Sequence, residues 1–260
     1  MGSTVADRFS AMASEYETYW AEVLMPANRQ LVAMVPMTRA QWVLDLGGGV
    51  GSLVPVLQAA APQARVVVSD RAEGMVRLAR SGHRVVADAC RLPFGPSTFD
   101  AVFLTFVLQY VEDADAMFRD VARALRPGGS VGVAGWGRLQ ETRSERIWMA
   151  GLDEFGAPPA PEARAVDRAP IDTMVKLDEA LTRAGFEHVR TRRLEWSDQP
   201  DAERFIDRMT HLGRSRQRLE QWDEQSRQTF VDAMHTRLGA LAPDGLRDDS
   251  QVLAAVGVIA

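Results

Sequence analysis

The sequence predicts an α/β fold, in which a largely parallel sheet carries helices on both faces. Short runs of β-branched and other apolar residues alternate with segments of helical periodicity across the first half of the chain. Residues 43–51 (VLDLGGGVG) also join the end of an apolar strand to a glycine turn and a following helix, expected over residues 52–61. The 260 residues, 46% of them hydrophobic, suffice for one core and an appended subdomain.

The composition argues against several classes of protein. A net charge of −5 argues against a chain built around nucleic-acid phosphates. The single cysteine, Cys90, excludes an intrachain disulfide and indicates a reducing, cytoplasmic location, where it would be a packed thiol. No apolar run approaches the roughly 20 residues of a membrane span. The four histidines lack the spacing of a metal site, so no metal is predicted.

The glycine turn indicates a nucleotide site. Gly47, Gly49 and Gly51 occupy alternate positions, where glycine allows positive φ and a close approach of the backbone to a ligand. A strand, such a turn and a helix N-terminus form a phosphate or nucleotide cradle at the carboxyl edge of a parallel sheet. Ser52 stands where the dinucleotide fingerprint requires glycine or alanine, which makes an NAD-linked oxidoreductase the weakest alternative.

Residues 5–35 carry apolar and aromatic residues at helical spacing, and Pro26 and Pro36 are expected to divide them into two helices. Such helices before the first strand can lie across a nucleotide pocket. We therefore predict an N-terminal helical lid over residues 1–38, although an ordinary core stripe has the same pattern.

The second strand, residues 65–69, ends at Asp70, which stands 19 residues after Gly51 (70 − 51). An acid at this distance typically accepts hydrogen bonds from ribose hydroxyls, and a helix N-cap is a compatible second role. Met75 in the next helix is a candidate for packing on the adenine ring, with core packing nearly as well supported.

The next strands continue the alternation. Residues 83–87 form a third strand followed by Asp88 and Ala89, and residues 99–104 form a fourth, followed by Thr105. An amphipathic helix over 114–125 ends at an Arg-Pro-Gly-Gly turn before the fifth strand, residues 130–136.

Five of these features resemble the motifs of class I S-adenosylmethionine (SAM) dependent methyltransferases, in the right order over about residues 40–137. They are the run VLDLGGGVG, the acid Asp70, the segment Asp88-Ala89-x-x-Leu92-Pro93-Phe94, the strand start Phe99-Asp100-x-Val102, and Leu125-Arg-Pro-Gly-Gly129. The nearest type is the small-molecule, ubiquinone- and menaquinone-methyltransferase-like group. Ala13-x-x-Tyr16 is also similar to a segment that such enzymes place beside the cofactor.

The resemblance implies a Rossmann-like sheet of seven strands with the last antiparallel, and SAM as cofactor with S-adenosylhomocysteine (SAH) as product. Asp88 would accept from the adenine amino group, the Ala89 amide would meet the ring, and Thr105 would lie beside the sulfonium. The predicted cofactor residues are Tyr16, Asp45, Gly47, Gly49, Gly51, Asp70, Arg71, Met75, Asp88, Ala89 and Thr105.

Methyl transfer from a sulfonium mainly needs alignment, so no obligatory nucleophile is expected. A base would help an oxygen or nitrogen acceptor, and Tyr110 and His211 are the candidates, each more often structural than catalytic. Gln109 occupies a place where relatives often carry histidine; it belongs to the candidate set, but an amide cannot act as a general base.

The remaining chain predicts a helix over 138–155, a loop over 157–170, a helix over 176–184, a strand over 186–196, helices over 200–241 and a last strand over 252–259. We expect a single domain organised as the lid (1–38), a SAM-binding core (39–200), a helical cap insertion (201–245) and the last core strand (246–260). The insertion is expected to line the acceptor pocket, with plain helix packing as the alternative.

The leading hypothesis is a methyltransferase that modifies oxygen, nitrogen or carbon of a small, largely apolar or aromatic metabolite, as in natural-product biosynthesis. A nucleic-acid or protein methyltransferase is less well supported, because no N/D-P-P-Y/F tetrapeptide follows the fourth strand. A SAM-binding relative that catalyses cyclisation or elimination, or only binds, stays open, because the motifs report the cofactor and not the reaction. The oligomeric state also stays open, with a homodimer as one option.

Overall fold

The computed structural model of this chain describes residues 4–79, 82–137, 142–160, 171–241 and 243–260. The chain divides into two compact units. The first comprises Met1–Arg138, Val166–Leu194 and Gln251–Ala260, and the second comprises Leu139–Ala165 and Glu195–Ser250.

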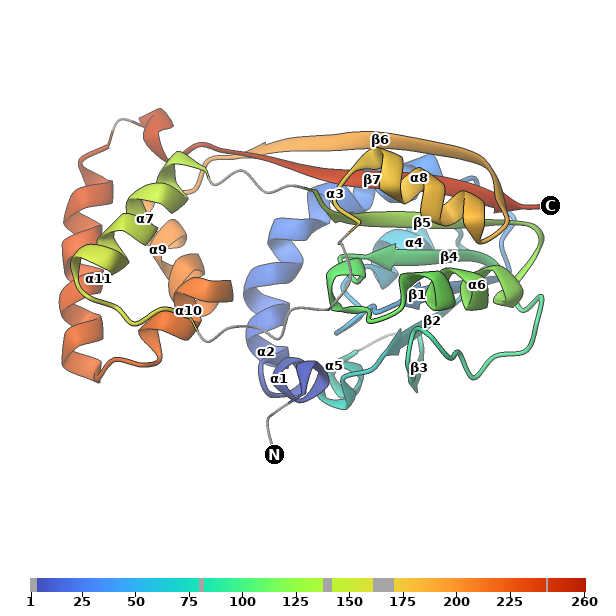
Figure 1. Cartoon of the computed structure of the whole chain (residues 1–260), viewed down its shortest axis with the longest axis horizontal. Helices are drawn as coiled ribbons and strands as arrows, with labels where there is room; N and C mark the ends of the chain where they lie inside the picture. The colour runs from blue at the N-terminus through green and yellow to red at the C-terminus, as the bar shows by residue number, and fades with distance from the viewer. Residues whose placement is uncertain (1–3, 80–81, 138–141, 161–170, 242) are drawn as a thin grey trace. The chain divides into compact units, whose positions relative to one another are not determined.

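Seven strands form one sheet in the order β3-β2-β1-β4-β5-β7-β6 (Figure 1). Their bounds are β1 Trp42–Leu46, β2 Arg65–Asp70, β3 His83–Val86, β4 Phe99–Thr105, β5 Leu125–Trp136, β6 Phe186–Asp198 and β7 Asp248–Ile259. Strands β1 to β5 pair in parallel, and β7 pairs antiparallel with β5. The predicted fold class, with its antiparallel last strand, is confirmed.

Helices cover both faces of the sheet, as predicted. Figure 1 draws α6 and α8 in front of the strands and α3 and α4 behind them. The helices of the first unit are α1 Val5–Ala11, α2 Ala13–Glu15, the π-helix η1 Tyr16–Trp20, α3 Ala21–Met34, α4 Val54–Ala60, α5 Glu73–Leu78, the 3-10 helix η2 Leu108–Tyr110, α6 Ala114–Ala124 and α8 Met174–Arg183.

The predicted break at Pro26 is wrong, because this proline lies inside α3. Proline removes one backbone hydrogen bond, but Leu24, Ala27 and Leu31 on the same helix are buried, and this packing outweighs the local loss. The helix ends at Met34, before Pro36, as predicted. The interruptions lie earlier, at Met12 and at η1.

Two other element boundaries differ from the sequence prediction. Strand β5 begins at Leu125, because the backbone there already pairs with Phe99 of β4. The Arg-Pro-Gly-Gly segment therefore lies inside β5, with Gly128 at φ +77°. The N-cap of α5 is Ala72 and not Asp70, whose side chain instead accepts from the Ala72 N–H.

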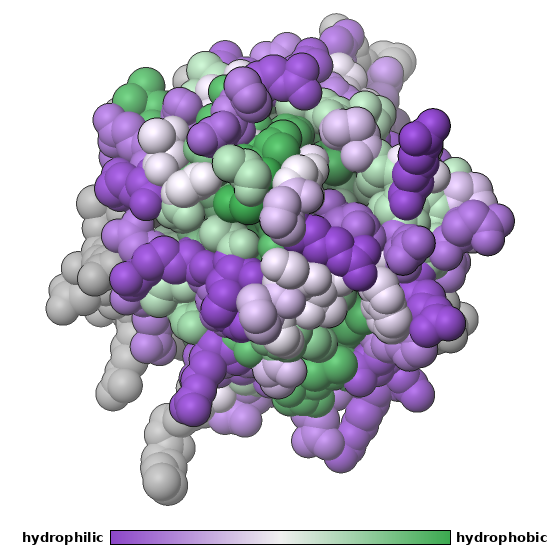
Figure 2. Space-filling view, turned by 90° about the vertical axis from the view of Figure 1, so that its right-hand side faces the viewer, coloured by the Kyte–Doolittle hydropathy of each residue, from purple (hydrophilic) through white to green (hydrophobic). Residues whose placement is uncertain are grey.

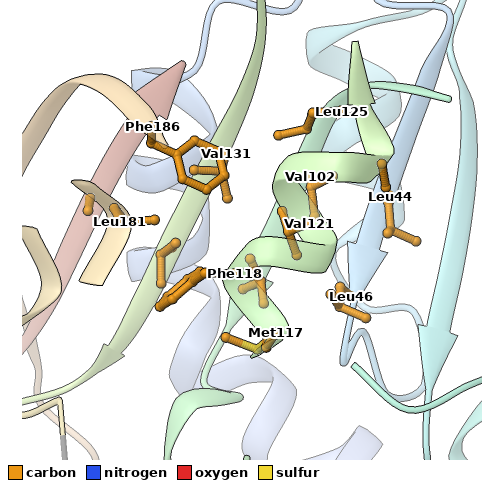
Figure 3. Packing of buried hydrophobic residues seen from close by; sticks show 14 of the residues in the cluster. Leu44, Leu46, Val102, Met117, Phe118, Val121, Leu125, Val131, Leu181 and Phe186 are labelled. Carbon is orange, nitrogen blue, oxygen red and sulfur yellow. The ribbon is translucent and has the colours of Figure 1, made fainter. Parts of the chain in front are cut away.

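One hydrophobic cluster of the first unit lies between the sheet and the front helices. Figure 3 shows Phe118 and Val121 of α6 pointing toward the strands, with Leu181 of α8 beside Phe186 of β6. Phe118, Val121 and Leu181 have no exposed surface. Burying each such side chain contributes roughly 1.5–3 kcal/mol, so this packing stabilises the attachment of α6 and α8 to this face of the sheet.

The second unit has its own aromatic core. Its helices are α7 Arg143–Glu154, α9 Ala202–His211, α10 Gly213–Leu219, α11 Glu224–Gly239 and the 3-10 helix η3 Pro243–Leu246. Trp148 of α7 is fully buried against Phe230 and Phe205, with ring centroids 4.9 and 6.2 Å away, and its indole N–H donates to Ser215. Helix α7 thus joins the helices after Pro200 in one packed group.

Hydrophilic side chains cover much of the face shown in Figure 2, and apolar side chains form smaller areas between them. This mixture agrees with a chain in which 25% of residues are charged. Within the described ranges, none of the helices has both the length and the apolarity that crossing a bilayer requires.

Helix α1 packs closely on α5 in the first unit (Figure 1). The backbone N–H of Gly74 donates to the Ser10 hydroxyl at 3.1 Å. A Cβ on Gly74 would lie 2.5 Å from the Ser10 carbonyl oxygen and 2.8 Å from its Cα. Glycine at position 74 is therefore what lets the two helices approach.

Gly74→Ala is predicted to loosen α1 and to destabilise the protein by about 1–3 kcal/mol, because backbone atoms must move to make room. Faster hydrogen exchange in α1 and a lower free energy of unfolding would show this. Gly239→Ala is the matched control: it is also helical, nothing lies within 4 Å of its added Cβ, and alanine should stabilise there. A stabilised Gly74→Ala variant would contradict the prediction.

Candidate cofactor site

The glycine turn after β1 adopts a conformation that few other residues could. Gly47, Gly49 and Gly51 have φ of +68°, +54° and +76°. The N–H groups of Gly47 and Gly48 both donate to the Ser69 carbonyl, at 2.7 and 3.1 Å, which ties the turn to β2. Because β1 lies between β2 and β4, the turn sits where the strand order reverses, the usual ligand site of such sheets.

One side of the turn is open. A Cβ added at Gly47 would collide with Val107 at 2.2 Å, whereas one at Gly49 would meet only Tyr16 at 3.7 Å and Met75 at 3.9 Å. Met75 is buried, and Tyr16 packs with it in a small apolar cluster. The arrangement is a cradle with an apolar wall on the side of Met75 and Tyr16.

Asp70 closes this cradle at the end of β2. One carboxylate oxygen accepts from the Gly49 N–H at 3.0 Å, and the other accepts from the Ala72 N–H at 2.8 Å. Burial raises the pKa of the Asp70 carboxyl, and these hydrogen bonds oppose the shift in part. The side chain thus joins the glycine turn to the start of α5.

Asp45 lies beneath the turn and is completely buried. Neither carboxylate oxygen has a hydrogen-bond partner among the described residues. A Cβ at Gly48 would lie 2.5 Å from its carboxyl group, so glycine is required there too. Burial, with a smaller contribution from the Asp70 charge, raises the pKa of Asp45 from 3.8 to about 7.

Tyr16 reaches this pair of acids from the N-terminal helices. Burial raises the pKa of its hydroxyl above the ordinary value of 10, and the charges of Asp70 and Asp45 add to the shift. The hydroxyl is therefore protonated and can donate a hydrogen bond. Phe9 of α1 packs edge-on against Tyr16, with centroids 6.2 Å apart, and holds the ring in place.

These features suit a cationic nucleoside. An unpartnered buried carboxylate next to a second acid is electrostatically unfavourable until a cation or donor approaches. The open cradle at Gly49, the buried Met75 and the orphaned oxygens of Asp45 fit the ribose, the adenine and the ammonium group of SAM. The residues present therefore fit the cofactor that the sequence predicts.

Thr105, the last residue of β4, is half-buried and is followed by a strained residue. Phe106 has φ +59°, in the left-handed region that residues other than glycine rarely adopt. Its N–H donates to the Ala134 carbonyl at 2.7 Å, and its ring packs on Trp136 with centroids 4.9 Å apart.

Comparison with known proteins decides the family. Residues 44–133 match the family model described as a methyltransferase domain. A demethylmenaquinone methyltransferase of Mycolicibacterium paratuberculosis is 32% identical over 191 residues, which cover 68% of this chain and 77% of that protein. The chain belongs to the SAM-dependent methyltransferase family. The resemblance seen in the sequence is confirmed, and SAM is the cofactor of this family, as predicted.

Two further matches show how much of a relative's length this chain covers. A malonyl-[acyl-carrier protein] O-methyltransferase of Methylococcus capsulatus is 33% identical over 56% of this chain, but the match spans only 57% of that protein. Phosphoethanolamine N-methyltransferase 2 of Haemonchus contortus shares the fold at a TM-score of 0.53 and 21% identity, over 90% of this chain and 52% of that one. The chain thus spans about half the length of these two proteins.

The residues predicted to bind adenine lie partly at the surface. Asp88 is exposed and accepts from the Cys90 N–H at 2.9 Å, while Arg71 approaches it to 3.9 Å. Ala89 packs against the core. The roles given to Asp88, Ala89 and Arg71 stay predictions.

Tyr110 and Gln109 lie on η2, directly after the strained turn, and both are exposed. The Phe9 ring packs edge-on against Tyr110, with centroids 4.9 Å apart. Burial of the hydroxyl raises the pKa of Tyr110, although a Gln109 hydrogen bond opposes the shift. The neutral phenol is a hydrogen-bond donor at neutral pH and a weak base.

His211 belongs to the second compact unit, whereas Tyr110 belongs to the first. It lies at the end of α9, where its Nδ1 is 2.8 Å from the Asp207 carbonyl oxygen and 3.3 Å from the Asp207 carboxylate. This local pairing with the preceding helical turn fits a structural role, and a catalytic role stays a prediction.

The sequence analysis missed two features of the site. The contact between Ser10 and Gly74 depends on two helices far apart in the chain, and no motif marks it. The left-handed backbone of Phe106 has no signal either, because the usual marker of such a turn is glycine or asparagine.

The raised pKa of Asp45 predicts a pH-dependent stability. Between about pH 4 and 7 the folded protein holds a proton that the unfolded chain has released, so the contribution of Asp45 to stability falls as pH rises through this window. Asp45→Asn removes this titration. The variant should gain stability relative to the natural protein by about 1.4 kcal/mol per pH unit between pH 5 and 7.

Denaturant unfolding of both proteins without cofactor, at several pH values from about 5 to 8, measures this difference. Asp115→Asn serves as control, because that carboxylate is exposed on α6 and pairs with Arg183. A difference between Asp45→Asn and the natural protein that stays constant with pH would show that Asp45 is ionised in the folded state.

Proposed function

We propose that this protein transfers a methyl group from SAM to a small, largely apolar or aromatic metabolite. The observation that carries the proposal is the buried, unpartnered carboxylate of Asp45 beneath an open glycine cradle that Asp70 borders. This is a site for a nucleoside that carries positive charge. Family membership supports methyl transfer as the reaction.

The residues of the cradle would each hold one part of SAM. Asp70 accepts hydrogen bonds from the ribose hydroxyls. Met75 packs on the adenine ring, and Asp88 accepts a hydrogen bond from the adenine amino group. Asp45 pairs with the ammonium group of SAM, and this positive charge stabilises the ionised carboxylate. The Tyr16 hydroxyl, on the N-terminal helices, donates a hydrogen bond to the cofactor. The glycines keep the backbone clear of the ligand on the open side of the turn.

When bound, SAM supplies a methyl group on a sulfonium: the acceptor forms a bond to the methyl carbon as the carbon–sulfur bond breaks, the electron pair stays on SAH, and the acceptor releases a proton. The protein contributes alignment of the two reactants in one line and exclusion of water. Thr105, the last residue of β4, would lie beside the sulfonium. Tyr110 can orient an acceptor by donating a hydrogen bond.

The site and two of the relatives support the proposed acceptor class. Two of the relatives are named as methyltransferases of demethylmenaquinone and of malonyl-[acyl-carrier protein]. The rings of Trp20, Phe106 and Trp136 beside β4 support an apolar or aromatic acceptor. A role in natural-product biosynthesis is consistent with such a substrate.

Asp70→Asn is predicted to weaken SAH binding about ten- to hundredfold, because hydrogen bonds to a charged group are replaced by weaker neutral ones. Isothermal titration calorimetry with SAH measures the change. Asp115→Asn should bind SAH as the natural protein does. If folded natural protein takes up neither SAM nor SAH, the proposed function fails.

Release of SAH, coupled to the gain of one methyl by an acceptor, distinguishes transfer from cyclisation or elimination, the alternative left open by the sequence. In such an assay His211→Ala is predicted to lower turnover while SAM affinity stays intact, because loss of a base affects the chemical step. Tyr110→Phe tests the second candidate in the same way. Unchanged turnover would remove the tested residue from the catalytic set.

A further inference from the structure

The carboxyl group of Asp45 lies in a closed, apolar environment. The strand register places Val68 of β2 and Phe103 of β4 beside Asp45, and both side chains are buried. The backbone of Gly48 packs over the carboxyl group, since an added Cβ would lie 2.5 Å from its Oδ2 atom. Neither oxygen of Asp45 accepts a hydrogen bond from any residue that the structure describes. A negative charge is strongly destabilised in such a place, so the protonated form of the carboxyl group is favoured.

Asp70 is the second acid of the site, and its surroundings are different. It stands two residues after Val68, on the same face of β2 and toward the glycine turn. One of its oxygens accepts from the Gly49 N–H at 3.0 Å, and the other accepts from the Ala72 N–H at 2.8 Å. These donors stabilise the ionised form of Asp70. Where two neighbouring carboxyl groups compete for one proton, the group without donors retains it, and here that group is Asp45.

The elements around Asp45 bring no compensating positive charge. Among the described residues, the titratable groups that act on Asp45 or are acted on by it are Asp70 of β2 and Tyr16 of η1. Tyr16 keeps its proton at neutral pH, and helix α4 after the glycine turn has no titratable residue. Other charged residues of the neighbouring segments pair away from Asp45: Arg71 with Asp88, Glu73 with Arg77, and Asp100 with Arg126. The negative charge of Asp70 therefore adds to the effect of burial on Asp45.

We infer that Asp45 holds a proton in the protein without cofactor and releases this proton to solvent when SAM or SAH binds. The inference rests on the proposed function, in which the ammonium group of the cofactor pairs with this carboxyl group. The positive charge of the ammonium favours the ionised carboxylate. The ammonium keeps its own protons, so the proton displaced from Asp45 passes to water or buffer. No covalent bond of the cofactor changes in this step.

Release of a proton makes the affinity for the cofactor depend on pH. Burial and the charge of Asp70 raise the pKa of Asp45 to about 7 in the protein without cofactor. Below this pH, binding must remove the proton, so affinity falls as pH falls. Above it the carboxyl group is already ionised, and affinity no longer rises. Acidification would therefore lower the fraction of the protein that carries cofactor.

The experiment is isothermal titration calorimetry of the full chain with SAH. Titrations at about pH 6 in two buffers that differ in their enthalpy of ionisation count the protons released on binding. The natural protein should release about one proton for each SAH bound. Its affinity for SAH should be about five- to tenfold lower at about pH 6 than at about pH 7.5, as expected for one group that titrates near pH 7.

Two variants and a second ligand assign the proton. Asp45→Asn has no proton to lose at this position, so it should bind SAH without proton release and with an affinity that does not change with pH. Asp115→Asn is the matched control, because that carboxylate is exposed and pairs with Arg183; it should release the same proton as the natural protein. 5′-Methylthioadenosine has the adenosine and the sulfur of SAH but no ammonium group. It should bind to the natural protein without proton release.

Uptake of SAH by the natural protein without proton release at about pH 6 overturns the inference and leaves the proposed function intact. Proton release by Asp45→Asn equal to that of the natural protein overturns it too, because the proton then comes from another group. Should Asp45→Asn fail to fold, the two ligands decide: equal proton release with 5′-methylthioadenosine and with SAH contradicts a displacement by the ammonium group. Absence of SAH uptake by the natural protein is a separate result, which defeats the proposed function first.

Discussion

The Asp45 carboxylate is buried without a hydrogen-bond partner in the part of the chain that the structure describes, and the rest of the site depends on this constraint. A carboxylate in the first strand of a parallel sheet lowers stability, and the raised pKa of Asp45 reports this cost. An apolar residue at this position would give a more stable sheet. In the proposed function the same desolvation would strengthen the pairing of the carboxylate with the ammonium group of SAM, so the cost to stability without ligand and the affinity for ligand would have one origin.

The cradle and the N-terminal helices share one short segment of chain. The Asp70 carboxylate accepts hydrogen bonds from the Gly49 and Ala72 N–H groups. Gly74 packs against helix α1, and the buried Met75 forms the apolar wall of the cradle. The proposed ribose contact of Asp70 and the packing of α1 on Gly74 therefore depend on the same turn of α5.

Strain is concentrated at the other side of the cradle. Val107 can pack against Gly47 only because residue 106 turns the chain through a left-handed conformation. The Ala134 carbonyl and the buried Phe106 ring compensate for that conformation. The end of β4 therefore closes the glycine turn on the side of Gly47.

The sequence by itself determined the order of strands and helices and the residues of the cradle. Glycines at 47, 49 and 51 and acids at the ends of strands are local signals, because backbone conformation and strand ends depend on neighbouring residues. Only the tertiary structure decided that Pro26 stays inside a helix, that Gly74 admits Ser10, that Phe106 is left-handed and that His211 lies in a different unit from Tyr110. Each of these depends on packing between segments distant in the chain, and local propensity carries no information about such contacts.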